Sequence, residues 1–395
     1  MKKGLIFLAV ILHVTVYSQL LKQQPEKLSE DGRLLFPELA DKYGFPAQEE
    51  SITTEDGYIL TLYHIPGDTS KPVLLIHGNT PTIDCWIIRG NSSLAITLAH
   101  RGYDVWVIAI RGTRYSRKHV SLDPDLQPDQ FFDYTFYEEG IYDVAVTIDF
   151  ILQKTGQEQL TAIGHSVGTT LLYVLGAEKP EYNDKIKLAV SLAPICFLQN
   201  LRGLTRLGGL LGPGLIDLLT LLNIQEVLSY DQITPVFQAI CLDEPLGYEL
   251  CIKIGLSAVL GADPKGIEPE FQKTLFGHFP GGSTRKLFSH LVQVLTRKKF
   301  AKYDYGSIKN LAVYGSFEPP EFDLKKVTMK SALFVGKEDF LSTPADAELL
   351  KAALPNVVHY QVLPYEKFNH PDFIWGRYMP DNFYPYLMEV LDKYE

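Results

Sequence analysis

The sequence lacks an excess of basic charge and, beyond its first residues, any long apolar run. Lysine and arginine total 37 against 47 aspartate and glutamate residues, a formal net charge of −10. Such a chain has no excess of positive charge that would attract nucleic acid. After the amino terminus no apolar run is long enough for a transmembrane helix. The hydrophobic share of 46%, with 22 tyrosines and 21 phenylalanines, excludes a disordered chain and predicts a globular protein.

The amino terminus has the pattern of a targeting segment. Two lysines precede an apolar stretch over residues 4–17, which is too short to span a bilayer. Val16 and Ser18 have the small-residue spacing of a cleavage site. We therefore predict that residues 1–18 are a secretory signal peptide, the alternative being an uncleaved membrane anchor.

Cysteine is scarce, with four residues that allow three pairings if all of them bond. Cys241 and Cys251 flank a polar turn that a disulfide could close. Cys85 and Cys196 lie in apolar surroundings, which is typical of buried thiols. Asn91 begins an Asn-Ser-Ser sequon, so a secreted chain would offer it as an N-glycosylation site.

Short apolar runs alternate with helical patterns and predict the fold. A hairpin at the Asp56-Gly57 pair leads into a half-buried strand over residues 58–65. Continuous runs that suit parallel strands buried on both faces follow at 72–76, 104–110, 160–163, 188–194, 331–336 and 357–363. Helical patterns cover 92–102, 138–154, 346–354 and about 383–394. The predicted class is therefore α/β, a mostly parallel sheet with helices on both faces.

Residues 195–320 interrupt this alternation, because they contain no convincing buried strand. Between residues 198 and 228 they carry a dozen leucines punctuated by glycines, a pattern that indicates short helical pieces. We expect an inserted helical cap with a mobile lid, which divides the core into residues 19–194 and 321–395. The alternative is that the leucines only pack the cap onto the core.

One motif carries the chemistry, the segment Gly164-His165-Ser166-Val167-Gly168. It follows the strand pattern at 160–163 and precedes a helical run at 169–177, the setting of a G-x-S-x-G nucleophile elbow. The elbow would present the Ser166 hydroxyl at the carboxyl edge of the sheet. The amino end of the next helix would favour negative charge at the reacting centre. The alternative is a glycine-rich turn with an idle serine.

A nucleophilic serine needs a base and a third group that holds the base. In this fold the order along the chain is Ser, acid, His. Asp339 lies just after a late strand, and its neighbour Glu338 is the rival acid. His370 lies in the loop beyond the last strand, whereas His359 lies inside that strand. We predict a triad of Ser166, Asp339 and His370. A turn carboxylate and a helix-cap histidine are the alternatives for the last two.

The turn after residues 72–76 reads His77-Gly78-Asn79, where α/β-hydrolases place part of the oxyanion hole. We predict that the backbone N–H groups of Asn79 and Val167 stabilise the oxyanion. The side chain of His77 is expected to be structural, because the donors are backbone groups.

Further motifs extend the pattern along nearly the whole chain. They are Tyr43-Gly44-Phe45-Pro46, Thr54 to Leu60, His77-Gly78 with Trp86, Gly102 to Trp106, Arg111-Gly112, Asp143, Thr147 to Phe150, Leu192-Ala193-Pro194, Tyr303 to Gly306, Phe368-Asn369-His370 and Asp372 to Gly376. In these residues the chain resembles the acid lipase family, which includes gastric lipase, lysosomal acid lipase and the insect lipase 3-like enzymes.

The resemblance implies an α/β-hydrolase core, a helical cap with a lid, and hydrolysis of neutral lipid esters by the triad Ser166, Asp339 and His370. It also places the family's cap disulfide near Cys241 and Cys251, and it implies neither a metal nor an organic cofactor. We expect a secreted or lysosomal lipase that acts on acylglycerols at a lipid–water interface. The alternatives are a carboxylesterase for smaller or sterol esters and a non-catalytic lipid carrier.

The chain departs from the family pattern near the predicted oxyanion hole. The family usually has a hydrophobic residue at the position of Asn79, glutamine at that of Val167 and asparagine at that of Ala109. The backbone donors survive these changes, but the polarity of the pocket does not. The cap, with its polar turn at 242–250, is the least similar region, so the substrate preference is left open.

Overall fold

The computed structural model describes residues 25–263 and 265–394. The predicted signal peptide, residues 1–18, lies outside the described residues. Over the described part, no helix combines the length and the apolar character needed to cross a membrane.

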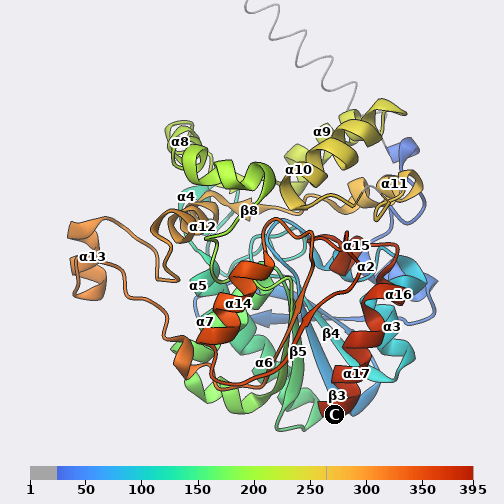
Figure 1. Ribbon diagram of the computed structural model, residues 1–395, viewed down its shortest axis with the longest axis horizontal. Coiled ribbons are helices and arrows are strands. Elements are labelled where there is room, and N and C mark those ends of the chain that lie inside the picture. Colours follow the sequence, from blue (N-terminus) through green and yellow to red (C-terminus); the bar gives the residue numbers. More distant parts are fainter. Residues whose placement is uncertain (1–24, 264, 395) are drawn as a thin grey trace, which may run out of the picture.

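An eight-stranded sheet forms the middle layer of the molecule (Figure 1). Its strand order is β1-β2-β4-β3-β5-β6-β9-β10. The β1–β2 and β2–β4 pairs are antiparallel, and the other five pairs are parallel. The strands are β1 (Gln48–Thr53), β2 (Ile59–Ile65), β3 (Asp68–Ile76), β4 (Tyr103–Ile108), β5 (Leu160–His165), β6 (Ile186–Leu192), β9 (Ser331–Val335) and β10 (Val357–Val362). The predicted α/β class with a mostly parallel sheet is confirmed.

The central strands read as continuous apolar runs because both faces of the sheet are covered. Successive residues of a strand point to opposite faces. Val73 and Leu75 of β3 therefore join one core cluster, whereas Leu74 and Ile76 join the other. The first cluster includes side chains of α2 (Phe36–Lys42), α3 (Leu94–His100) and α17 (Tyr384–Tyr394). The second includes side chains of α6 (Ala145–Thr155), α7 (Val167–Glu178) and α14 (Pro344–Ala353).

The helix expected over residues 138–154 is not uniform. It begins as α5 (Phe136–Glu138), continues as the π-helical turn η4 (Glu139–Val144), and only then becomes α6. Thr135 and Glu138 form a capping box at its start, in which the Glu138 carboxylate accepts the Thr135 N–H at 2.8 Å. The remaining short elements of the core are η1 (Pro25–Lys27), η2 (Ile83–Trp86), η3 (Gly90–Ser92), α4 (Pro128–Phe131), η5 (Pro180–Lys185), η8 (Leu324–Lys326), α15 (Asp372–Trp375) and α16 (Met379–Asn382).

Between β6 and β9 the chain leaves the sheet and forms mainly helices, in the segment for which we expected the cap. They are η6 (Gly203–Leu207), α8 (Gly208–Leu221), α9 (Tyr230–Cys241), the π-helical η7 (Tyr248–Leu256), α10 (Ser257–Leu260), α11 (Pro269–His278), α12 (Arg285–Arg297) and α13 (Ser307–Tyr314). Two strands of two residues each, β7 (Glu226–Val227) and β8 (Ser283–Thr284), pair within it. Figure 1 shows α8 to α12 gathered beyond one end of the strands, with α13 projecting to the side.

The leucine-rich run is less broken than its glycines suggested. Helix α8 continues through Pro213. A proline inside a helix removes one backbone hydrogen bond and crowds the carbonyl four residues earlier. Here that earlier residue is Gly209, and no side chain of residue 209 adds to the crowding.

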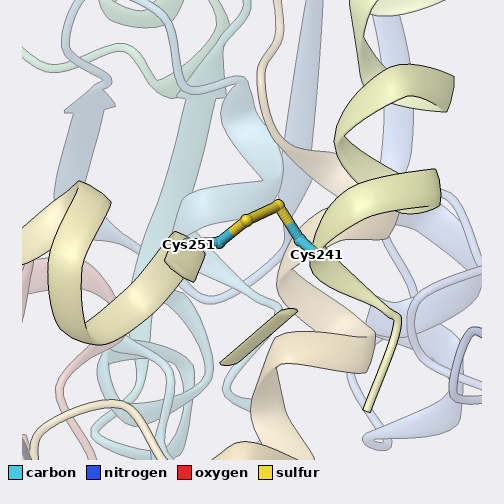
Figure 2. Close-up of a disulfide and its surroundings, with 2 residues drawn as sticks. All are labelled: Cys241 and Cys251. Carbon is cyan, nitrogen blue, oxygen red and sulfur yellow. A yellow bond between two sulfur atoms is a disulfide. The ribbon is translucent and has the colours of Figure 1, made fainter. Parts of the chain in front are cut away.

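A disulfide ties two helices of this segment together (Figure 2). It joins Cys241, the last residue of α9, to Cys251 in η7, with 5.6 Å between their Cα atoms. It closes the polar turn between them. Cys85 and Cys196 are free thiols, and both are buried.

Candidate active site

Ser166 lies at a sharp turn between β5 and α7. Its backbone has φ 55° and ψ −125°, a left-handed conformation that a residue other than glycine adopts only under strain. Both flanking glycines are required by close packing. A Cβ on Gly164 would lie 2.7 Å from the carbonyl group of Gly168, and a Cβ on Gly168 would lie 2.4 Å from the carbonyl oxygen of Ile76. The turn therefore has the geometry of a nucleophile elbow.

Asp339 and His370 meet at the carboxyl ends of β9 and β10. Asp339 is fully buried, and its Oδ2 lies 2.9 Å from Nδ1 of His370. The other carboxylate oxygen accepts the backbone N–H groups of Leu341 at 2.8 Å and Ser342 at 2.7 Å. With both oxygens engaged, the carboxylate is fixed, and it orients the imidazole with Nδ1 as the donor.

The two rival residues lie elsewhere. The Glu338 carboxylate faces away to Arg202, with its Oε2 3.3 Å from the guanidinium. His359 lies within β10, and its ring packs against Phe334. Of the candidates that the sequence offered, the structure brings Asp339 and His370 together.

Ser166 and His370 line the same cavity. In the part of the chain that the structure describes, no hydrogen bond joins the Ser166 hydroxyl to the His370 ring. Such bonds are often long before substrate binds. Burial lowers the pKa of His165 well below its usual range, so this ring is neutral. Its Nε2–H donates to the carbonyl of His370 at 3.0 Å and holds the loop that carries His370.

The turn from His77 to Thr80 packs directly against Ser166. A Cβ on Gly78 would lie 2.9 Å from Cβ of Ser166. Asn79 and Val167 both line the cavity, and among the described residues neither backbone N–H has an acceptor. His77 is structural, as expected. Burial lowers its pKa to about 4, its Nε2 accepts the Ile110 N–H at 3.2 Å, and its Nδ1–H donates to the Gly78 carbonyl at 2.8 Å.

The cavity has a volume of about 710 Å³ and is lined by both the core and the inserted helices. Its polar residues are few, and apart from Thr205 they come from the segments around Ser166, His370 and the 78–80 turn. The apolar lining comes largely from the segment between β6 and β9 and from the loop after His370: Leu198, Leu201, Leu215, Leu228, Phe237, Leu250, Leu256, Val259, Leu260, Phe276, Phe279, Phe288, Leu291, Val292, Leu295, Ile374 and Trp375. Among the described residues, no aspartate, glutamate, lysine or arginine lines it.

The sequence did not single out Glu139, although it is buried beside the predicted oxyanion hole. Its only signal is a carboxylate just before the apolar stripe that begins at Ile141. The adjacent Glu138 has the same signal and merely caps a helix, so pattern alone could not separate them. Asn91, the predicted glycosylation site, is exposed in η3.

The chain is similar in sequence to known families and proteins. Residues 71–204 match the family described as alpha/beta hydrolase fold, and residues 36–90 match the partial alpha/beta-hydrolase lipase region. Lipase 1 of Drosophila melanogaster is 32% identical, over 94% of this chain and 82% of that protein. Gastric triacylglycerol lipase of Mus musculus is 32% identical, over 88% of this chain and 89% of that protein. Lysosomal acid lipase/cholesteryl ester hydrolase of Rattus norvegicus is 31% identical, over 91% of both chains.

Solved structures agree on the fold. An esterase, RhEst1 from Rhodococcus sp., superposes with a TM-score of 0.51 at 14% identity, over 88% of this chain and 98% of its own. Naproxen esterase from Bacillus subtilis superposes with a TM-score of 0.51 at 13% identity, over 93% of this chain and 99% of its own.

Proposed function

The chain belongs to the acid lipase family of α/β-hydrolases, and from this premise we propose that it is a serine lipase acting on neutral lipid esters such as acylglycerols. Two observations of different kinds support the proposal. The relatives named above are lipases by name. Ser166 and His370 line one apolar cavity, and Asp339 holds the His370 ring from behind it.

In the proposed reaction Ser166 is the nucleophile. His370 takes the hydroxyl proton as Ser166 attacks the ester carbonyl, and it then returns that proton to the leaving alcohol. Asp339 holds the imidazole by its Nδ1–H and stabilises the imidazolium that forms. Water activated by His370 then hydrolyses the acyl-enzyme. The Ser166–His370 hydrogen bond forms in the complex with substrate.

The backbone N–H groups of Asn79 and Val167 form the proposed oxyanion hole. Both residues line the cavity beside Ser166, and Val167 is the first residue of α7. Free N–H groups at a helix start favour negative charge. Donors that are fixed before the reaction stabilise the tetrahedral intermediate without reorganisation.

The lining of the cavity is the single observation that carries the substrate class. A site of about 710 Å³ without a charged aspartate, glutamate, lysine or arginine among its described lining residues suits an uncharged apolar substrate. A charged headgroup placed there would lose its hydration without finding a partner.

The surroundings of the cavity support access from a lipid surface. Leu211 and Leu221 of α8 are 66% and 82% exposed, and Leu218 between them is half exposed. Leu215 of the same helix is both exposed and part of the cavity lining. Exposed apolar residues continuous with a pocket mark an interaction site. We assign residues 195–320 as the cap and the α8 region as its lid.

The same proposal covers the location of the protein. Residues 1–18 direct it into the secretory pathway, to the extracellular space or the lysosome. A disulfide between Cys241 and Cys251 is compatible with that oxidising route. Asn91 is exposed, so it is accessible for glycosylation.

The deciding experiment measures hydrolysis of emulsified long-chain triacylglycerol and of a soluble short-chain ester by the wild type and by Ser166→Ala. Loss of both activities in Ser166→Ala, with a strong wild-type preference for the emulsion, is the expected result. Turnover of the soluble ester alone would instead indicate a carboxylesterase. Lipid binding without any turnover that depends on Ser166 would indicate a carrier.

A further inference from the structure

A second, much smaller cavity lies beside the turn that forms the proposed oxyanion hole. It shares the residues Gly78 to Thr80 and Val167 with the large cavity, and Glu139 and Ser283 lie on its wall. Its volume is about 10 Å³, which is room for about one water molecule. The position matters because Asn79 and Val167, which carry both proposed oxyanion donors, line the same small cavity as Glu139.

Glu139 brings an ionisable group to that wall. The residue is only 6% exposed and belongs to the π-helical turn η4. Its backbone N–H donates to the Thr135 carbonyl at 3.3 Å. Within residues 25–263 and 265–394, no protein group forms a hydrogen bond with its carboxyl group. The hydroxyl of Ser283 on the same wall is also buried without a partner.

Arg111, the one arginine among the described residues that line this small cavity, is already fully engaged. Arg111 donates to Asp56 from both terminal nitrogens, at 2.5 and 2.9 Å, and to Asp143 from Nε at 2.8 Å. Two carboxylates therefore compensate its charge before Glu139 is counted. The other groups that face Glu139 add no positive charge: they are Glu138 and Asp143 from its own helix, Tyr134, and the neutral ring of His77.

The protonated form of Glu139 is favoured in this environment. Burial, followed by the charge of Asp143, raises the pKa of the Glu139 carboxyl well above its usual range. A protonated carboxyl can donate one hydrogen bond and accept others. With the Ser283 hydroxyl it can hold a single water against the 78–80 turn.

We propose that Glu139 is a positioning residue of the oxyanion hole, which supports the 78–80 turn as a neutral acid and impairs the hole when it ionises. The inference rests on the proposed function. A negative charge on Glu139, in the small cavity that Asn79 and Val167 also line, repels the charge that develops on the substrate oxygen. The repulsion is strong there because Glu139 is buried away from bulk solvent. Turnover should therefore fall as pH rises through the ionisation of Glu139.

The test compares pH profiles of kcat and KM for the wild type, Glu139→Gln and Glu138→Gln, with a soluble short-chain ester that avoids effects of the lipid surface. Glutamine has the shape of the neutral acid and cannot ionise. Glu138→Gln is the matched control, since glutamine preserves the capping box. In the wild type and in Glu138→Gln, we expect kcat to fall roughly tenfold as pH rises, with little change in KM. Glu139→Gln should lack this alkaline fall.

Stability supplies a readout that does not depend on turnover. Glu139→Gln should match the wild type in melting temperature at acid pH and exceed it at alkaline pH, where the wild type must bury a charge. An alkaline fall unchanged in Glu139→Gln, or an equal loss at every pH, would overturn the inference while leaving the proposed function intact. Absence of any Ser166-dependent turnover in the wild type would overturn both, and it is seen before the variants are compared.

Discussion

Asp339 Oδ2 lies 2.9 Å from His370 Nδ1, although 31 positions of sequence and a whole strand separate the two residues. The contact exists because β9 and β10 are parallel neighbours whose carboxyl ends reach the same edge of the sheet. It fixes which ring nitrogen is left free to face Ser166. If the pair acts as proposed, its effect on catalysis should be large and its effect on folding small.

Replacing Asp339 by asparagine should lower kcat by about 10⁴-fold, because the amide favours the wrong imidazole tautomer. Glu338→Gln is the matched control at the neighbouring position, and it should retain nearly full activity. Ester hydrolysis and melting temperature are measured for both variants. If Glu338→Gln were the inactive one, the assignment of the acid would be wrong.

Gly78→Ala should inactivate the protein with little loss of the global fold. The new methyl group would lie 2.9 Å from Cβ of Ser166 and 3.1 Å from the carbonyl oxygen of His165. The 78–80 turn, which carries the proposed oxyanion donor Asn79, must therefore move. A displacement of that kind costs about 100-fold or more in turnover. Gly214→Ala on α8 is the control, because a Cβ there meets nothing within 4 Å. Equal activity of both variants would argue against the proposed position of the oxyanion hole.

The exposed leucines of α8 should matter only at a lipid surface. Changing Leu211, Leu218 and Leu221 to serine together should lower hydrolysis of emulsified triacylglycerol by about tenfold or more and leave soluble esters unaffected. The matched control changes Ile308, Leu311 and Val313 of α13, which are likewise exposed but line no part of the cavity. An equal loss in both triple variants would point to general surface hydrophobicity instead.

The disulfide should contribute to stability rather than to chemistry. Its ends lie 10 positions apart, and closing a loop of that size is worth about 3 kcal/mol in the chain-entropy account. Changing both Cys241 and Cys251 to serine should lower the free energy of unfolding by that order, as measured with denaturant. Reductant should lower the wild type to the same level. A variant as stable as the oxidised wild type would contradict the prediction.

Acid pH should favour the contact between the inserted segment and the loop that carries His370. Asp263 and Asp372 face each other there, since a Cβ on Gly266 would lie 2.9 Å from Oδ2 of Asp263 and 2.5 Å from Oδ1 of Asp372. Burial, then the charge of Asp263, raises the pKa of Asp372 well above its usual range. The folded state therefore holds a proton that the unfolded state releases. The stability from this proton is complete below the unfolded pKa and is lost as pH rises through the folded pKa.

Asp263→Asn should consequently stabilise the protein by roughly 1 kcal/mol at pH 7 and have little effect near pH 4. Denaturant unfolding at the two pH values measures the difference. Asp217→Asn, at an exposed carboxylate of α8, is the control and should change neither value. A gain that is the same at both pH values would show that the effect is not electrostatic.

Much of the fold and of the candidate site follows from local patterns. The strands at 72–76 and 160–163 are recognisable because burial on both faces makes them continuously apolar. The glycines around Ser166 indicate that the turn is closely packed. Asp339 and His370 were expected from chain order in this fold, and the structure brings their side chains into contact.

What local patterns cannot give is the outcome of packing between distant segments. Leu201 and Leu221 belong to the same leucine-rich run, yet one is buried and the other is 82% exposed. Glu138 and Glu139 are neighbours of identical type, but only Glu139 lines the small cavity beside the 78–80 turn. The approach of Asp263 to Asp372 depends on how the inserted segment folds back onto the sheet. These relationships join residues far apart in the sequence, and no sequence periodicity predicts them.

The place of the insertion has a consequence for the order of folding. Strands β6 and β9 are neighbours in the sheet, with Ala189 opposite Ser331, and the whole helical segment intervenes between them. Pairing across so long a separation in sequence is slow, because the chain entropy is lost before the contacts form. Ser166 lies on the β6 side of that junction, and Asp339 and His370 lie on the other. Ser166 therefore comes close to His370 only once β6 and β9 have paired, so a chain still folding would carry the proposed nucleophile without its proposed base.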